Sequence, residues 1–345
     1  MKQEIDENRL YWIDVVRIVA CCMIVLMHSP HPNAGNPGIL LVPLSFITAA
    51  GIGLFFMVSG TLLLPVQTDT KSFLQKRFGK IAGPLLFWTL FYLGVSIISG
   101  EKHASSLPHA LVSIPFSTQG HGILWFMYTL AGLYLLAPII SPFLAKASKH
   151  DVRFYLTLWA ATLCFPIVAN FADVNNSVTG ALYYFSGYVG YFVLGFYMHT
   201  FKPHIPNYMK VLLLVMPIIC LLAFKMLCKD GGLYDYFWYL SVFVVMMCIA
   251  WYDGIRSLMQ RYIIGGGKLH IIKELSNCCF GVYLIHIFIM RYFLWHIDVL
   301  VYGLGGVAQI VLTWILTLAI SFVLTYCISF LPYADYIIGI KKKHK

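Results

Sequence analysis

Arg17 and His28 are spaced in the sequence so that their side chains could take part in one reaction. Both belong to an apolar segment that runs from Tyr11 to His28. If this segment is a helix, the interval between the two residues corresponds to about three full turns, which places both side chains on one face, about 16 Å apart along the axis. A guanidinium binds anionic groups, and an imidazole exchanges a proton near neutral pH. The spacing therefore places a cation and a titratable imidazole on one face of a single helix, which makes this face a candidate functional site.

Asp14 precedes Arg17 by about one helical turn and falls on the same face. The segment is long and apolar enough to cross a membrane, where an ionisable residue costs roughly 2.5–3.5 kcal/mol on insertion scales. Charges retained at such a cost usually serve a function. The alternative interpretation is a structural ion pair between Asp14 and Arg17, with His28 at the surface. We favour the functional interpretation.

The composition of the whole chain is that of an integral membrane protein. The chain is 60% hydrophobic and 11% charged, and its mean hydropathy is +0.78, values outside the range of soluble domains. We expect an all-α bundle of about ten transmembrane helices that forms a single domain over residues 1–345, with short cytoplasmic tails at about 1–10 and 337–345. The expected spans are 11–31, 39–64, 83–99, 122–144, 154–171, 181–199, 211–228, 236–252, 275–293 and 304–330.

The distribution of basic residues predicts the orientation of this bundle. If the N-terminus is inside, 19 of the 24 lysines and arginines lie in inside segments and three in outside segments. Cytoplasmic loops are the positively charged ones, so we expect both termini in the cytoplasm. The same bias explains the net charge of +10 through contact with the lipid bilayer, without nucleic acid. The nine cysteines form no C-x-x-C pair, and we expect neither a disulfide framework nor a metal site.

Candidate residues on other spans could face the first helix. Ser59 lies in a glycine-containing segment that suits close helix packing, and it can form a hydrogen bond between helices. Arg77 and Lys80 belong to a basic cluster that suits polyphosphate binding or anchors the inside loop. His121 is expected at the outer rim, at the level of His28. Two further candidates have structural alternatives: Trp125 as an interfacial anchor, and His286 as a buried structural histidine.

Four segments of the chain together resemble the type 3 membrane acyltransferases of bacteria. They are Asp14-x-x-Arg17 followed by His28, Phe55-Phe56-x-x-Ser59-Gly60, Leu124-Trp125-Phe126 with the following Gly132 to Pro138, and Tyr283-Leu-Ile-His286. The match runs from about residue 9 to residue 330 in the order of the family. Within the family the chain is similar to the compact branch, which includes the enterobacterial common antigen O-acetyltransferase.

The resemblance implies an O-acyltransferase of the bacterial cytoplasmic (inner) membrane. It would move an acyl group, usually acetyl, from cytoplasmic acyl-CoA to a hydroxyl of an extracytoplasmic glycan or lipid-linked saccharide. Acetyl-CoA, or another acyl-CoA, is then a co-substrate, and we expect no permanently bound cofactor. His28 would be the general base, and a covalent acyl-histidine is the variant of this mechanism.

The remaining candidates then fall into two groups around His28. The donor-binding group consists of Arg17, Asp14, Arg77 and Lys80. In this group Arg17 would bind the coenzyme, and Asp14 would orient the side chain of Arg17. The group expected along the tunnel or on the acceptor side consists of Ser59, His121, Trp125 and His286.

Two other functions are compatible with several spans and intramembrane charges. A transporter or flippase of glycans or other polar solutes has the same general features, but no inverted repeat or pair of broken helices supports it here. A membrane sensor without catalytic activity is the third possibility. The motifs favour the acyltransferase over both.

Overall fold

The computed structural model is a helical membrane bundle. It describes residues 9–32, 38–103, 105, 107–114, 124–172, 180–227, 236–262 and 266–340. Over these ranges the chain forms helices and no β-strand. Nine helices of this part of the chain are long and apolar enough to cross a membrane. The prediction of an all-α, multi-pass membrane protein is therefore confirmed.

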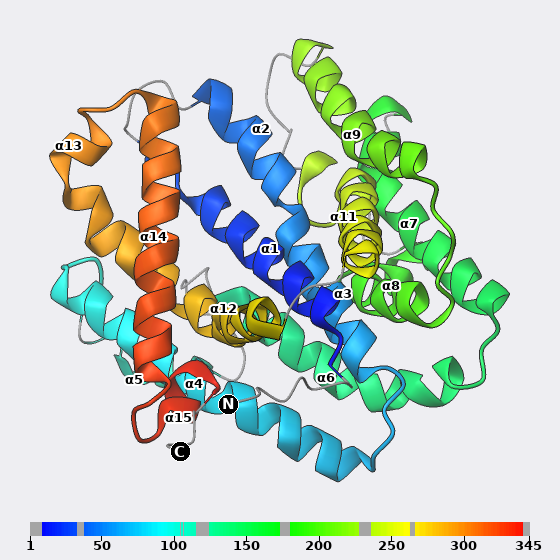
Figure 1. Cartoon of the computed structure of the whole chain (residues 1–345), viewed down its shortest axis with the longest axis horizontal. Helices are drawn as coiled ribbons and strands as arrows, with labels where there is room; N and C mark the ends of the chain where they lie inside the picture. Colours follow the sequence, from blue (N-terminus) through cyan, green and yellow to red (C-terminus); the bar gives the residue numbers. More distant parts are fainter. Residues whose placement is uncertain are drawn as a thin grey trace.

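The helices follow one another in a simple order (Figure 1). The first expected span corresponds to α1, and the second corresponds to α2 and α3 together. Helix α3 follows α2 closely, because α2 ends at Thr48 and α3 begins at Ala50. The elements are α1 (Tyr11–His28), α2 (Gly38–Thr48), α3 (Ala50–Leu63), α4 (Thr70–Ile98), α5 (Leu107–Ser113), α6 (Trp125–Leu144), α7 (Lys149–Ala172), η3 (Ala181–Phe185), α8 (Val189–Thr200), α9 (Asn207–Leu227), α11 (Val242–Arg261), α12 (Gly266–Tyr292), η4 (Leu294–His296), α13 (Asp298–Val301), α14 (Gly306–Ile328) and α15 (Ala334–Ile338).

The sixth expected span, 181–199, differs from the others because it is a broken helix. It consists of η3 and the twelve-residue α8, which are separated by Ser186 and by Gly187 at a φ of 90°. Glycine adopts this left-handed conformation without steric cost, so the helix can stop there. A helix as short as α8 does not by itself cross about 30 Å of hydrocarbon.

The short helix α8 is held inside the bundle by close contact with α3. A Cβ atom added at Gly60 would lie 1.8 Å from the carbonyl oxygen of Phe192, and one added at Gly195 would lie 1.9 Å from that of Met57. The two backbones therefore touch at their glycines, as small residues allow in membrane bundles. Non-helical backbone is tolerated at membrane depth where protein surrounds it, and this packing supplies that environment.

The direction of α12 relative to α1 indicates that the η3–α8 segment is one of the membrane crossings. Arg17 of α1 contacts Ser276 of α12, and His28 contacts His286, so the two helices run in the same direction. An odd number of crossings must lie between two parallel spans. The long candidate spans between them, within the described residues, number six. The η3–α8 segment supplies the remaining crossing, in agreement with about ten spans.

Helix α1 lies in the middle of the bundle, where it can position a site. Figure 1 shows α1 between the α12–α14 side of the molecule and the side formed by α8 and α11. It packs against α2, α3, α11, α12 and α14. Half of its residues are buried, among them Val16, Ala20 and Val25. Its polar residues Asp14, Arg17 and His28 each contact a residue of α12.

Candidate functional site

Asp14 is the centre of a buried polar cluster at the N-terminal end of α1. Arg9 donates to both carboxylate oxygens of Asp14, at 2.6 and 2.9 Å. Ser276 of α12 donates to Oδ1 at 2.7 Å. Nη1 of Arg17 lies 3.8 Å from the same oxygen and donates to the hydroxyl of Ser276 at 3.2 Å. Asp14 thus neutralises Arg9 directly, and Ser276 connects it to Arg17.

The guanidinium of Arg17 lines a cavity of about 280 Å³, which we call the inner cavity. The structure brings three of the predicted residues together here, namely Arg17, Ser59 and Lys80. Two cations in a largely aromatic wall suit an elongated ligand with an anionic end. The lining residues are Arg17, Phe55, Ser59, Lys80, Ile81, Phe126, Leu130, Tyr134, Ser276, Asn277, Phe280, Tyr283, Gly339 and Ile340.

Two other predicted donor residues are near this cavity but do not line it. Asp14 accepts a hydrogen bond from Ser276, and Ser276 is the residue that lines the cavity. The guanidinium of Arg77 lies over the ring of Phe73, 5.6 Å from its centroid. Arg77 is half-buried, and its Nε has no hydrogen-bond partner within the described part of the chain. Of the two basic residues, which lie about one turn apart on α4, Lys80 lines the inner cavity and Arg77 does not.

His28 lines a second cavity, of about 460 Å³, which we call the outer cavity. His286 and Trp125, both predicted from the sequence, lie in the same wall. Charged residues of both signs, Glu101, Lys102 and Arg291, also line it, together with several tyrosines. The full lining is Ile24, Met27, His28, Ile52, Tyr92, Ser96, Glu101, Lys102, Trp125, Tyr239, Tyr283, His286, Ile287, Arg291 and Tyr292.

The two histidines of the outer cavity are neighbours with different surroundings. Their ring centroids are 5.5 Å apart. Nδ1 of His286 lies 2.7 Å from the carbonyl oxygen of Tyr283. A carbonyl only accepts, so Nδ1 must carry the proton, and Nε2 keeps the lone pair when the ring is neutral. Nε2 is buried and has no hydrogen-bond partner among the described residues.

Tyr283 lines both cavities, so its side chain lies where the two meet. Its ring packs against that of Phe126, with centroids 5.3 Å apart. The same helices, α1, α3, α4, α6 and α12, contribute residues to each cavity. Arg17 and His28 therefore lie in two cavities that meet at Tyr283, about 16 Å apart by the rise of α1.

Several residues of the site could not be found from the sequence. Arg9 precedes the start of α1, so helical periodicity does not connect it to Asp14. Glu101 and Tyr239 enter the outer cavity from distant parts of the chain, and no spacing relates them to His28. His121, which was predicted at the outer rim, lies outside the described residues. Within the described residues, no group of three or more histidine, cysteine or acidic residues could hold a metal ion.

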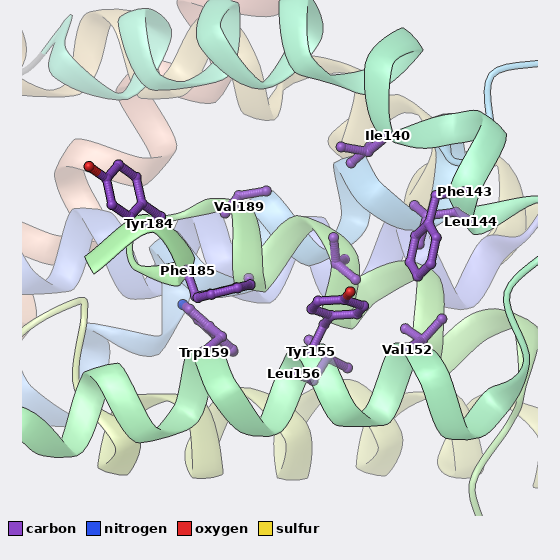
Figure 2. Close-up of a pocket in the computed structure, with 12 residues that line it drawn as sticks. Ile140, Phe143, Leu144, Val152, Tyr155, Leu156, Trp159, Tyr184, Phe185 and Val189 are labelled. Atoms are coloured by element: carbon purple, nitrogen blue, oxygen red, sulfur yellow. The ribbon is translucent and has the colours of Figure 1, made fainter. Parts of the chain in front are cut away.

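A third hollow, of about 260 Å³, contains none of the predicted residues (Figure 2). It lies between α6, α7, η3 and α8, and apolar or aromatic side chains such as Phe143, Tyr155 and Trp159 line it. Its described lining contains no charged residue. Among the described residues, the predicted site residues that line a cavity lie in the two cavities along α1.

One of three comparisons with known proteins found a match. No curated protein and no solved structure matches the chain. The family model described as an acyltransferase domain matches residues 10–334. This range contains Arg17, His28 and Tyr283. By this match over nearly its whole length, the chain belongs to the acyltransferase-3 family of membrane acyltransferases.

Proposed function

We propose that this protein transfers an acyl group, in the first instance acetyl, from cytoplasmic acyl-CoA to a hydroxyl of an extracytoplasmic glycan or lipid-linked saccharide. The bacterial cytoplasmic membrane is the proposed location. One observation carries the proposal. A cationic cavity and a cavity with two histidines meet at Tyr283, and α1 provides the key residue of each.

The inner cavity suits the acyl donor. Coenzyme A combines phosphate groups with a long, uncharged arm that ends in the thioester. Arg17 and Lys80 can bind its anionic groups, because cations form strong hydrogen bonds with phosphate oxygens. The aromatic wall formed by Phe126, Tyr134 and Phe280 suits the arm. Asp14 supports the donor end indirectly, because Ser276 connects it to the guanidinium of Arg17.

The outer cavity suits a saccharide acceptor. Its wall combines tyrosine hydroxyls with Glu101, Lys102 and Arg291, so that it offers both donors and acceptors of hydrogen bonds. Sugar hydroxyls need both kinds of partner. A few polar groups in a largely apolar pocket fix the orientation of a ligand, which is what selects one hydroxyl among several.

His28 is the proposed general base of the transfer. The acceptor hydroxyl gives its proton to the imidazole while its oxygen attacks the thioester carbonyl, and a C–O bond forms as the C–S bond breaks. The imidazolium then returns the proton to the departing thiolate of coenzyme A. A base in this position contributes typically about 10²–10⁴-fold to the rate. A covalent acyl-histidine would divide the same reaction into two steps.

The proposal is tested by acyl transfer in proteoliposomes that contain the full chain, with acetyl-CoA and an isolated glycan fraction. We expect His28→Ala to lower the rate about 10²–10⁴-fold while the protein stays folded and inserted. His28→Gln keeps a hydrogen-bonding group but cannot take the proton, so it should be equally inactive. The control is His150→Ala, because His150 is exposed and lines neither cavity. Full activity of His28→Ala would exclude this mechanism, and glycan movement without acylation would favour a transporter.

A further inference from the structure

A fourth cavity, of about 480 Å³, lies apart from the two cavities that residues of α1 line. It is formed by the connection between α8 and α9, the start of α9 and the C-terminal part of α11. Within the described residues it shares no lining residue with the inner cavity. It is lined by Lys202, Pro203, His204, Ile205, Pro206, Asn207, Lys210, Asp253, Arg256, Ser257, Gln260 and Arg261.

This cavity, which we call the basic cavity, opens on the same side of the membrane as the N-terminal end of α1. Trp12, in the first turn of α1, stacks on His199 at the end of α8, with ring centroids 6.2 Å apart. Lys202 follows shortly after His199. By the distribution of lysine and arginine in the loops, this side is the cytoplasmic one. The basic cavity therefore lies where helix ends meet the inner surface of the bilayer.

An ion-pair cluster with excess positive charge forms the floor of the basic cavity. Nζ of Lys210 lies 2.8 Å from one carboxylate oxygen of Asp253, and Arg256 contacts the other oxygen. The side chains of Lys210 and Arg256 are only 12% and 11% exposed, and that of Asp253 is 3% exposed. One carboxylate thus neutralises one of two nearly buried cations. The remaining positive charge is poorly hydrated, which strengthens its attraction for an anion.

Two more cations stand at the rim of the same cavity. Lys202 and Arg261 are exposed, and Asp253 is the one acidic residue in the described lining. Other inside-loop lysines such as Lys146 and Lys149 are also exposed, but they line none of the four cavities. Anchoring the loop explains basic residues at a surface. It does not explain four cations arranged around one hollow with a single carboxylate.

We propose that the basic cavity binds a phosphate group, either the headgroup of an anionic phospholipid or a free phosphate compound from the cytoplasm. A guanidinium and an ammonium together match the geometry and charge of phosphate oxygens. Basic pockets between membrane helices on the cytoplasmic side are suited to anionic headgroups. This site is independent of the acyl-transfer reaction, because none of its residues lines the inner or the outer cavity.

The test uses the purified full chain and a variant of the rim, Lys202→Gln combined with Arg261→Gln. Both side chains are exposed, so the fold should tolerate their loss. The matched control is Lys146→Gln combined with Lys149→Gln, which removes the same charge elsewhere on the inside surface. One arm measures by native mass spectrometry how much phosphatidylglycerol, compared with phosphatidylcholine, each protein retains. The other arm measures the thermal shift produced by inorganic pyrophosphate at low and high salt.

We expect the wild type and the control variant to bind one of the two anionic probes. The affinity of the rim variant for that probe should be lower by about tenfold or more. Loss of phosphatidylglycerol retention alone identifies a lipid headgroup, and loss of the pyrophosphate shift alone identifies a free phosphate compound. Equal binding by wild type and rim variant in both arms overturns the proposal. An equal loss in the control variant overturns it as well, because the effect would then be general surface charge.

Discussion

The imidazole rings of His28 and His286 lie 5.5 Å apart, on helices that run in the same direction. The environments of the two rings suggest different roles. His286 is fully buried, and its Nδ1 donates a hydrogen bond to the carbonyl oxygen of Tyr283. His28 is half-buried at the end of α1 and lines the outer cavity. A general base must reach the proton that it removes, which favours His28 as the base and His286 as the residue that positions it.

We therefore predict that loss of the imidazole is more harmful at position 28 than at position 286. His286→Gln keeps a side-chain N–H that can donate to the Tyr283 carbonyl, so it should preserve the local backbone. Its rate of acyl transfer should fall by less than that of His28→Gln, measured at saturating donor and acceptor. If the order is reversed, His286 is the base and its unpartnered Nε2 is the atom that accepts the proton.

Arg17→Ala should weaken the use of the acyl donor. A hydrogen bond to a charged group contributes about 1.5–3 kcal/mol, so the KM for acyl-CoA should rise about ten- to a hundredfold. The KM for the acceptor should change little, because Arg17 lines only the inner of the two cavities along α1. Arg17→Lys should restore part of the loss, since it keeps the charge.

Arg77→Ala provides the internal comparison for Arg17→Ala. Both substitutions remove an arginine, but Arg77 lies over Phe73 and does not line the inner cavity. Its effect on the KM for acyl-CoA should therefore be smaller. An unchanged KM in Arg17→Ala, or a larger effect of Arg77→Ala, would contradict the assignment of the donor end to Arg17.

The sequence predicted α1 and its two polar ends because both properties are local. Helical periodicity relates Arg17 to His28, and the structure places one in each cavity along α1. The pairing of α1 with α12 is not local, since more than half of the chain separates Ser276 from Arg17. Hydrophobicity reports that both segments span the membrane, but it carries no information about which spans touch.

The break in the sixth span also escaped prediction, for a different reason. Residues 181–199 are apolar almost throughout, so their composition is that of a continuous helix. The helix is interrupted by the left-handed backbone at Gly187. Glycine is common inside membrane helices, and one glycine does not predict a break. At the break, Nε1 of Trp159 in α7 donates to the carbonyl oxygen of Gly187 at 2.9 Å, a contact between two helices that composition does not report.

The packing of α8 against α3 leads to a prediction about stability. Gly195→Ala should destabilise the protein, because the new Cβ would lie 1.9 Å from the carbonyl oxygen of Met57 and the two helices would have to separate. Overpacking of this kind typically costs about 1–3 kcal/mol. The control is Gly94→Ala in α4, where the added Cβ would have no described atom within 4 Å apart from its own helix backbone and chain neighbours. Thermal unfolding in detergent should show a lower midpoint for Gly195→Ala alone, and equal midpoints would contradict the observed contact.

Tyr283 should determine whether the acyl group reaches the acceptor or water. Its side chain forms part of the wall of both cavities, and Phe126 packs against it. Tyr283→Ala widens the passage between the two cavities, through which the thioester must reach His28, so water can occupy the space beside the reacting carbonyl. We expect the release of free coenzyme A without acceptor to increase relative to acyl transfer. Tyr283→Phe keeps the ring and should keep the ratio of transfer to hydrolysis close to that of the wild type.

The measurement for Tyr283 compares two products in the same reaction. Thiol release reports every cleaved thioester, and mass spectrometry of the glycan reports those acyl groups that reached the acceptor. In the wild type the two amounts should agree. In Tyr283→Ala, thiol release should exceed glycan acylation, because the aromatic ring no longer excludes water from the reacting carbonyl. If the two amounts still agree in Tyr283→Ala, the thioester is protected by other residues and Tyr283 is only part of the wall.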